Sequence, residues 1–563
     1  MNIAVLDLVV LIAFLVVSIG IGLWFSRRSG ENSESFFLAG RSLTWPLIGA
    51  SMFATNISAH QFIGQGGLAY SVGVGASIWQ LVGVVGIFLL GMVFLPKFLH
   101  MRLYTLPQFL QDRYSVSVRS FISGYSIILI ITTLLTGSLY AGALILQKLL
   151  GMDSVFSLYV FIVVLAVAST FYTYLGGLKA VVLTDFIQNI VLILGGVCTL
   201  IFALLYISNK MPGGLAELGN LQEVTDGGEV FSKWSMYRPA NHQGIPFLGI
   251  ATGAVIMGLG VHCFSHEYVQ RGLGAKNIYH GKMGSLFGCV LKVVAIFIIG
   301  VPGVLASYIL KDEGVSANES IIVLIMKILP EGVTGIVLAG LIAAIMSTID
   351  SALCACSSLF TIDFYLRKNP DVSEKKSVLV GRIAMIICMV AGILMSPFIA
   401  SFEHLFQYIQ AITGYIVGPM VVVYLAGLYF PRSNNQAAVA TLLIGIITGV
   451  GAFFINNLNS FAEGTFKDIP LIKNALIAAY DFLPGWLTGL HFLYVCFALF
   501  ILSSVVMIVV SYVTPPPPPE CRDAAKLHDY GDFKTKTLHG SRKIAIMIGI
   551  LVIITAITLW VFR

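Results

Sequence analysis

An oxygen-rich stretch interrupts one of the apolar runs of this 563-residue chain. Ser347, Asp350 and Ser351 follow an i, i+3, i+4 spacing, so they share one face of a helix, and Thr348 lies beside them. Hydroxyl, carbonyl and carboxylate oxygens are hard ligands, which suit a hard cation rather than a soft metal. Hydroxyl side chains in membrane helices also bond their own or a neighbouring helix, but the carboxylate of Asp350 favours an ion site.

A second carboxylate, Asp185, lies near the start of another apolar run. Two interpretations are open from the sequence. The carboxylate could be stabilised there by the dipole at the start of a helix, or it could be a ligand for a cation.

Several polar side chains also lie within apolar runs, namely Gln61, Gln80, Lys292 and Gln410. A buried glutamine amide offers two donors and an acceptor oxygen, which suit a polyhydroxylated or otherwise polar solute. The glutamines could equally join helices to one another. Lys292 lies about ten residues from the start of its run, a long reach for snorkelling to the inner surface, so we expect its ammonium to face a pocket.

Other kinds of chemistry have little support in the sequence. The histidines His60, His262 and His266 lack the spacing of a metal site, and we interpret them as packing or hydrogen-bonding residues. No phosphate-binding glycine loop, nucleophile elbow or zinc motif is visible. The sequence therefore predicts that the protein is not an enzyme.

The elements that must position these side chains are membrane helices. The chain is 57% hydrophobic and only 11% charged, whereas soluble domains carry about 25% charged residues. Its apolar residues gather in runs of the length that crosses a bilayer. We expect about fourteen spans in a single transmembrane domain over 1–563, at 5–25, 45–70, 72–99, 119–147, 154–177, 179–207, 246–272, 283–310, 334–366, 377–399, 405–430, 436–455, 487–513 and 544–562.

The basic residues indicate the orientation of these spans. When loops are assigned alternately to two sides, most of the 33 lysines and arginines fall on one side, including Arg27, Arg102, Arg271, Arg367 and Lys534. The positive-inside rule makes that side cytoplasmic. Both termini then face outward, which requires an even number of spans. The net charge of +6 reflects this topology and not a nucleic-acid-binding surface. A proline run at Pro515–Pro519 predicts a stiff tether before the last span.

Two spans carry polar interruptions of the kind found where transporter repeats begin. The second span contains the polar string Asn56–Gln61, and the seventh contains Gly258-Leu259-Gly260 followed by His262 and Ser265. Five spans separate the two starts, and an odd spacing inverts the second unit relative to the first. The sequence therefore predicts two inverted repeats, at about 45–207 and 246–430.

The combination of motifs along the whole chain resembles the sodium/solute symporter family, and within it the sodium/glucose and sodium/galactose branch. The motifs that carry this resemblance are Phe36–Leu43, Ala54–Ser58, Tyr104–Pro107, Gly176–Leu178 with Thr184-Asp185, Val269–Arg271, Ser347-Thr348 and Phe406–Gln410. The resemblance implies a LeuT-like fold of five plus five inverted spans, with a broken helix at the start of each repeat.

The resemblance also implies two places for sodium ions. The first would use the carbonyls of Ala54, Ile57 and Ala344 with the hydroxyls of Ser347 and Thr348, and this sequence matches all five positions. A second sodium, held by some members, would lie among Asp185, Ser347, Asp350 and Ser351. Asp350 departs from the serine or threonine of the sugar branch. Its added charge would strengthen the site or bind a proton instead.

The sugar site of the family carries over only in part. Asn56, Gln61, Lys292 and Gln410 match sugar-bonding positions, while Trp79 and Phe406 match the outer gate. Other positions depart, because Gln80 replaces an acidic residue, Gly83 a serine, Gly258 an asparagine, and Val261 the tyrosine that stacks on the sugar ring.

These observations predict a sodium-coupled symporter that imports a small polar solute, such as a sugar or polyol, across a cell membrane by alternating access. The altered pocket leaves two alternatives open. The solute could be a carboxylate, amino acid or vitamin, or the protein could be a sodium-dependent sensor with little transport. The expected partners are sodium, the solute and the lipid bilayer, without nucleic acid.

Overall fold

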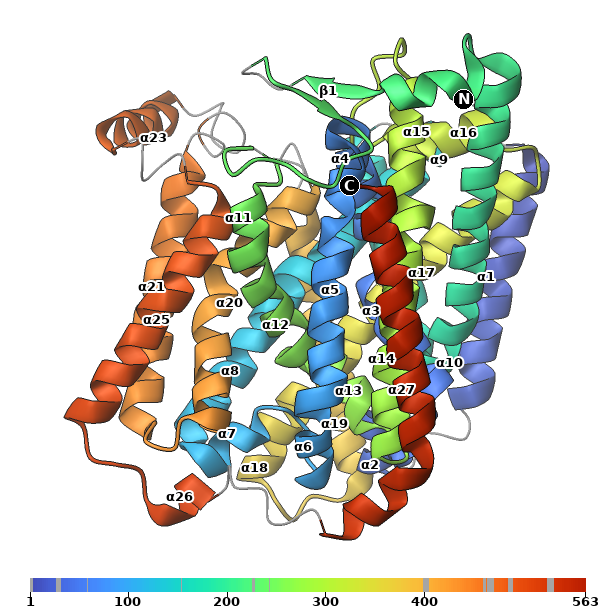
Figure 1. The fold of residues 1–563 in the computed structure, drawn as a ribbon. Helices are drawn as coiled ribbons and strands as arrows, with labels where there is room; N and C mark the ends of the chain where they lie inside the picture. Colours follow the sequence, from blue (N-terminus) through green and yellow to red (C-terminus); the bar gives the residue numbers. More distant parts are fainter. Residues whose placement is uncertain are drawn as a thin grey trace.

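The computed structural model describes residues 4–26, 32–57, 59–152, 154–224, 228–242, 244–397, 405–458, 462, 470–484, 490–523 and 531–563. In these residues the regular structure is helical, apart from one antiparallel hairpin of β1 (Gln222–Val224) and β2 (Val230–Ser232). The helices stand side by side as one bundle (Figure 1). The predicted all-α membrane architecture is confirmed.

The longer helices form the frame of the bundle. They are α1 (Val5–Ser26), α10 (Val155–Lys210), α14 (Ile278–Ala295), α17 (Val333–Phe360), α19 (Glu374–Met395), α20 (Leu405–Tyr429), α21 (Asn435–Asn456), α25 (Phe492–Val513) and α27 (Gly531–Val561). The span that begins with α17 is 94% buried in the bundle, whereas the apolar part of α27 is only 11% buried. The oxygen-rich stretch therefore lies on the most enclosed helix of the molecule.

Shorter helices complete the spans and connect them. They are α2 (Ser33–Leu38), α3 (Trp45–Asn56), α4 (Ala59–Val72), α5 (Ile78–Leu89), α6 (Leu95–His100), α7 (Gln108–Arg113), α8 (Val116–Leu129), α9 (Thr136–Leu150), α11 (Phe247–Gly249), α12 (Val255–Cys263), α13 (His266–Leu273), α15 (Val301–Ile309), α16 (Ser320–Ile328), α18 (Leu366–Lys368), α23 (Pro470–Phe482) and α26 (Pro519–Asp523). Short π-helical turns continue α5 into α6, α8 into α9, α14 into α15 and α17 into α18.

The second predicted span is broken where the polar string lies. Helix α3 ends at Asn56, and the next residue, Ile57, leaves the helical region with φ −82° and ψ 77°. Helix α4 then begins at Ala59. A helix that ends inside the bundle leaves the carbonyls of its last turn without their usual N–H partners, so this break provides free oxygens at that depth.

The seventh predicted span is also broken, but later than its glycines suggest. Gly258 and Gly260 lie inside α12, and the chain bends by 46° only after Cys263, between α12 and α13. Ser265 has extended backbone angles at the start of α13. Glycine is tolerated in membrane helices, so the two glycines did not locate the break.

The chain reverses direction at two glycines. Gln80 Nε2 on α5 donates to Gln65 Oε1 on α4 at 2.5 Å, although fifteen residues of straight helix would separate them by about 22 Å. The reversal falls at Gly73, whose φ is +82°. The 56-residue α10 would likewise be about 84 Å long if straight, far more than a bilayer. It turns at Gly177, with φ 59° and ψ −159°.

The number of spans depends on these reversals. By length and apolar composition, eleven helices of the described part could cross a membrane, or twelve if the bent pair α12–α13 is one span. In that number, Gln61–His100 is one helix. Val155–Phe171, the first part of α10, is a shorter apolar helix and is not included. Reversals at Gly73 and Gly177 divide the same residues further. Fourteen spans, and the boundaries of the two repeats, stay predictions.

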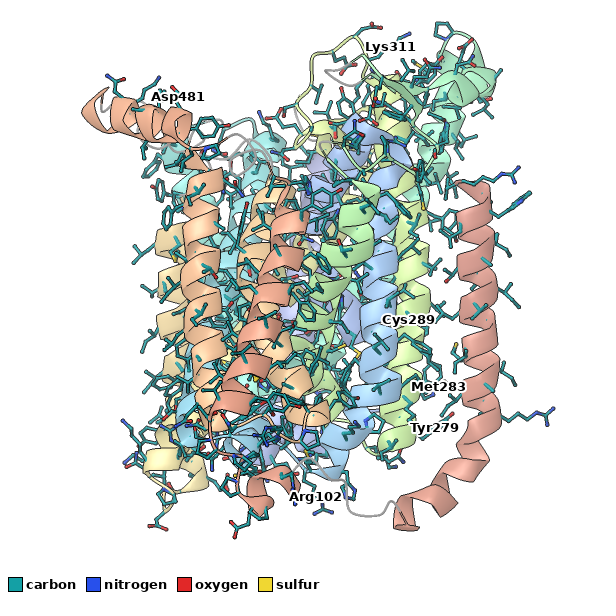
Figure 2. All side chains as sticks on the ribbon, turned by 60° about the vertical axis from the view of Figure 1, so that its left-hand side comes forward. Arg102, Tyr279, Met283, Cys289, Lys311 and Asp481 are labelled. Atoms are coloured by element: carbon teal, nitrogen blue, oxygen red, sulfur yellow. The ribbon has the colours of Figure 1, made fainter. Side chains whose placement is uncertain are left out.

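One end of the bundle carries the hairpin and both chain termini (Figure 1). The backbone N–H of Met236, just after the hairpin, donates to the carbonyl of Phe562 at 2.8 Å, and the rings of Trp234 and Phe562 stack 6.4 Å apart. Figure 2 shows Lys311 and Asp481 at this end and Arg102 at the other.

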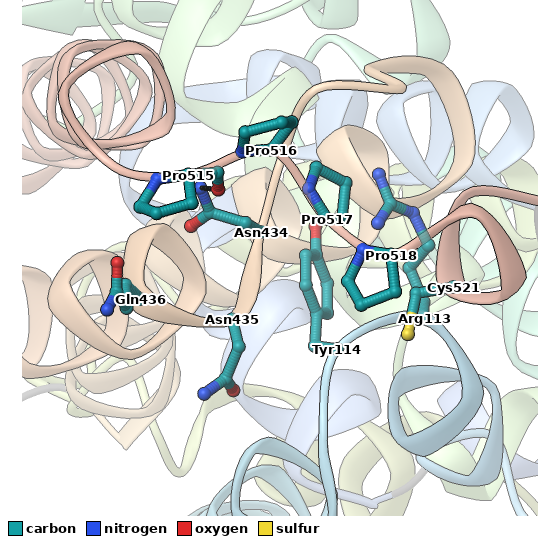
Figure 3. Close-up of a pocket in the computed structure, with 10 residues that line it drawn as sticks. All are labelled: Arg113, Tyr114, Asn434, Asn435, Gln436, Pro515, Pro516, Pro517, Pro518 and Cys521. Atoms are coloured by element: carbon teal, nitrogen blue, oxygen red, sulfur yellow. Dashed lines mark hydrogen bonds between the residues drawn. The ribbon is translucent and has the colours of Figure 1, made fainter.

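The proline run packs against the end that carries Arg102. It lines a pocket of about 240 Å³ together with Arg113, Tyr114 and Asn434 (Figure 3). Asn434 Nδ2 donates to the carbonyl of Pro515 at 2.9 Å and to Thr514 Oγ1 at 2.7 Å. The start of the tether is therefore fixed to the bundle before the chain continues toward α27.

Candidate functional site

The predicted first sodium site gathers at the break of α3 and the middle of α17. Ala54 and Ile57 lie at the end of α3, and Ala344, Ser347 and Thr348 lie on α17, all at most 3% exposed. The Thr348 hydroxyl donates to the carbonyl of Ala344 at 3.1 Å. Helices α3 and α17 pack against each other, so the break and the hydroxyls lie on neighbouring helices inside the bundle.

Asp185 joins three helices at this region. From α10 its carboxylate accepts hydrogen bonds from Ser347 of α17 at 2.5 Å and from Ser51 of α3 at 2.6 Å. The carboxyl group is fully buried. Because Ser347 gives its proton to Asp185, both lone pairs of its oxygen are available to a cation.

A fourth helix brings a cation to the same cluster. Arg271 of α13 donates to Ser51 Oγ at 3.3 Å and also to Ser351 Oγ and the carbonyl of Glu267. Arg271, which we counted among the basic residues of the cytoplasmic side, has a fully buried side chain. Its hydrogen bonds to the cluster compensate the burial of its charge.

The four residues expected around a second sodium have different partners. Asp185 pairs with Ser347, whereas Asp350 accepts from Thr173 on the first arm of α10 at 2.7 Å. Ser351 is bonded by Arg271 and lies 3.3 Å from the hydroxyl of Thr55. The structure therefore brings Asp185 and Ser347 into direct contact and directs Asp350 and Ser351 to other groups.

A second polar cluster lies among α4, α5 and α14. Lys292 Nζ donates to Gln80 Oε1 at 2.9 Å, and Gln80 Nε2 lies 3.4 Å from Gln61 Oε1. Lys292 and Gln80 are each 1% exposed. The ammonium thus lies inside the bundle and does not snorkel to a surface. Gln65, absent from our prediction, completes the cluster through its bond with Gln80.

Three further predicted solute residues lie on the broken and neighbouring helices. Asn56 ends α3 and is half-buried, and its Oδ1 has no hydrogen-bond partner among the described residues. Val261 on α12 and Gln410 on α20 are also half-buried. These three residues make no hydrogen bond to the Gln80 cluster that the structure describes.

Of the two predicted gate residues, the structure describes the side chain of Trp79. The ring of Trp79 is 7% exposed and stacks on Phe492 of α25, with centroids 6.2 Å apart and planes within 4°. Phe406 lies in the first turn of α20, and its side chain falls outside the described residues.

A model of the "Sodium:solute symporter family" matches residues 36–445, most of the chain and both helix breaks. The chain belongs to the sodium:solute symporter family. It is therefore a membrane-embedded transporter that couples a small polar solute to sodium, and not an enzyme.

Curated relatives of this symporter are similar over most of its length. The sodium/glucose cotransporter of Vibrio parahaemolyticus is 31% identical over 465 residues, which cover 79% of this chain and 84% of that protein. Sodium/myo-inositol cotransporter 2 of Rattus norvegicus is 30% identical over 479 residues, covering 79% of this chain and 69% of that one.

Solved structures show the same fold. A substrate-bound, outward-open Na⁺-coupled sialic acid symporter superposes with a TM-score of 0.74 at 20% identity, covering 91% of this chain and 98% of that one. The predicted LeuT-like architecture with broken helices is confirmed.

The spacing of polar residues in the sequence of this symporter could have indicated the site residues that our prediction left out. Ser51 and Thr55 are four residues apart, as are Gln61 and Gln65, and such pairs share a helix face. Arg271 gave a weaker signal, because a charged residue at the end of an apolar run is typical of a loop.

Proposed function

We propose that this symporter imports a sugar or polyol together with sodium. The names of its relatives, which transport glucose and myo-inositol, support this solute class. The observation that carries the proposal is the buried cluster of Gln61, Gln80 and Lys292, on α4 of the broken span and on α5 and α14. Amide and ammonium groups of this kind bind the hydroxyls of a polar solute.

We place the transported sodium at the break of α3, with the carbonyls of Ala54, Ile57 and Ala344 and the hydroxyls of Ser347 and Thr348 as ligands. Asp185 supports this placement, because its negative charge lies one hydrogen bond from Ser347. Sodium would attach α3 to α17 and so favour the arrangement of α4 that presents Gln61 to the solute. Asp350 and Ser351 would serve a second ion of the same network.

The solute would contact Asn56, Gln61, Gln80, Lys292 and Gln410, with Val261 beneath it. Trp79 and Phe406 would close the pocket from outside. A partly exposed valine at position 261 gives less stacking surface than an aromatic ring, so we expect the pocket to accept solutes other than simple hexoses.

Energy from one sodium ion is sufficient for strong accumulation. A tenfold gradient supplies about 1.4 kcal/mol, and a potential of 100 mV adds about 2.3 kcal/mol per charge. Together these support accumulation by about 500-fold. We place the protein in a cell membrane with both termini outside.

Uptake by purified protein in liposomes tests the proposal. Radiolabelled glucose and myo-inositol should enter under an inward sodium gradient, and unlabelled polyols should compete. Solute binding without sodium-driven accumulation would contradict the proposal.

A further inference from the structure

We infer that the preferred solute of this symporter is an acid, a sugar or polyol that carries a carboxylate, and that Lys292 binds this group. The inference rests on the proposed function and specifies the solute class of the same pocket. It comes from the charge of the pocket, which the described side chains leave uncompensated.

The ammonium of Lys292 has a neutral partner. It donates to the amide oxygen of Gln80 at 2.9 Å, and an ammonium has three N–H groups to place. No aspartate or glutamate of the described part of the chain forms an ion pair with Lys292. The side chain is 1% exposed, so bulk solvent does not screen the charge of the ammonium.

The orientation of Gln80 is fixed by a chain of hydrogen bonds. Its Nε2 donates to Gln65 Oε1 at 2.5 Å, and Gln65 Nε2 donates to the carbonyl of Ala76 at 3.1 Å. The amide oxygen of Gln80 therefore stays directed at Lys292. This relay positions the ammonium firmly but adds no negative charge.

His262 faces the same place from α12. A Cβ atom built on Gly83 would lie 2.8 Å from Lys292 Nζ and 3.4 Å from His262 Nε2, so both nitrogens pack closely against this glycine of α5. His262 Nδ1 lies 2.9 Å from the carbonyl of Gly258. Because a carbonyl only accepts, Nδ1 carries the proton and the Nε2 of the neutral ring is an acceptor.

The polar cluster around Lys292 therefore offers a cation and an acceptor next to each other. His262 Nε2 is buried and has no hydrogen-bond partner among the described residues, so it is available to a hydroxyl donor. A carboxylate on Lys292 with a neighbouring hydroxyl on His262 satisfies both groups. A neutral sugar would satisfy His262 and leave the buried charge of Lys292 without an opposite charge, which is unfavourable in a membrane interior.

Competition between matched sugars tests the inference in the full-length protein. Reconstituted symporter would be assayed with an inward sodium gradient, using glucuronate against glucose and galacturonate against galactose. Since hydrogen bonds to charged partners are markedly stronger than neutral ones, we expect each uronate to compete at a concentration at least about tenfold lower than its neutral twin.

Two substitutions connect this preference to the cluster. Gln80→Glu supplies an internal anion for Lys292 and should abolish the preference for the uronate over the neutral sugar. Lys292→Gln removes the cation and should also abolish the preference. Gln222→Glu, on the exposed strand β1, is the matched control and should keep the preference.

The outcomes separate this inference from the proposed function. If neutral sugars enter under a sodium gradient and uronates do not compete better, the inference is wrong and the proposed function stands. If neither sugars nor sugar acids enter, both are wrong. The comparison with unmodified protein decides the question even if a variant fails to fold.

Discussion

At the level of single residues, the carboxylate of Asp185 joins the helices around the proposed sodium site. It holds hydroxyls from α3 and α17, and Arg271 bonds two hydroxyls of the same network. A substitution in this cluster should therefore weaken sodium-coupled uptake by more than its effect on the stability of the protein explains.

The hydroxyls of Ser347 and Thr348 provide the first prediction. Ser347→Ala and Thr348→Ala each remove one ligand oxygen, so the sodium concentration for half-maximal uptake should rise by about tenfold, or about 1.4 kcal/mol. Sodium titration of uptake measures this. Ser357→Ala and Thr334→Ala on the same helix should leave the titration unchanged. Normal sodium dependence in both site variants would reject the placement.

The two buried aspartates provide the second prediction. Asp185 bonds Ser347 directly, whereas Asp350 bonds Thr173. We therefore expect Asp185→Asn to raise the sodium requirement by about tenfold or more, and Asp350→Asn to raise it less. The opposite order would favour Asp350 as the main ion ligand. Uptake driven by a pH gradient without sodium would point to a proton instead.

The sequence did not predict these hydrogen-bond partners, and the reason is physical. The spacing of Ser347, Asp350 and Ser351 indicated a shared face, but it could not tell which neighbouring helix each side chain meets. That depends on how α10, α13 and α17 are rotated against one another. The buried position of Arg271 follows from the same packing, which a count of basic loop residues does not contain.

At the level of elements, the chain is organised by breaks and reversals. Apolar runs and their polar interruptions predicted the break after Asn56 and the change of direction between 177 and 179. In the other repeat the predicted interruption contained Gly258, Gly260 and Ser265, and the break falls at its later part, because the two glycines remain helical while Ser265 takes the extended conformation. Glycine content alone does not locate a break within a membrane helix.

The reversal at Gly177 provides the third prediction. Its backbone angles lie in a region open essentially to glycine, and a Cβ atom there would be 2.6 Å from the carbonyl of Phe36. Gly177→Ala should cost about 1–3 kcal/mol in strain alone and lower the thermal unfolding midpoint in detergent. Gly451→Ala, with open space around it, should leave the midpoint unchanged. Equal midpoints for both variants would contradict the assignment.

The hairpin at the termini provides the fourth prediction. Arg238 is fully buried, pairs with Glu223 at 2.9 Å and bonds the carbonyl of Val72 at 2.6 Å, just before the Gly73 reversal. Burial lowers the pKa of Arg238, and the charge of Glu223 opposes this. Glu223→Gln should therefore destabilise the fold by about 3 kcal/mol, measured by thermal unfolding. Glu331→Gln, on an exposed residue, should have little effect, and equal stability of both variants would exclude this role.

At the level of the whole molecule, both termini lie at one end of the bundle and Arg102 at the other (Figures 1 and 2). In the orientation that we propose, the positive-inside rule places the Arg102 end in the cytoplasm. Arg271 is buried in the bundle and is one of the basic residues on which the proposed orientation rests.

Cys521 gives the fifth prediction, on orientation. It is partly exposed between α25 and α27, so a membrane-impermeant maleimide should label it only after cells are permeabilised. Cys521→Ser should remove that labelling. Labelling from outside intact cells would place the termini in the cytoplasm.

The most direct test of the account is solute accumulation by the purified protein in liposomes. With an inward sodium gradient and no other energy source, a transported sugar, polyol or sugar acid should rise well above its external concentration. Replacement of external sodium by potassium should reduce it to equilibration or below. Accumulation that is equal in sodium and potassium, or binding without any accumulation, would contradict sodium-coupled symport.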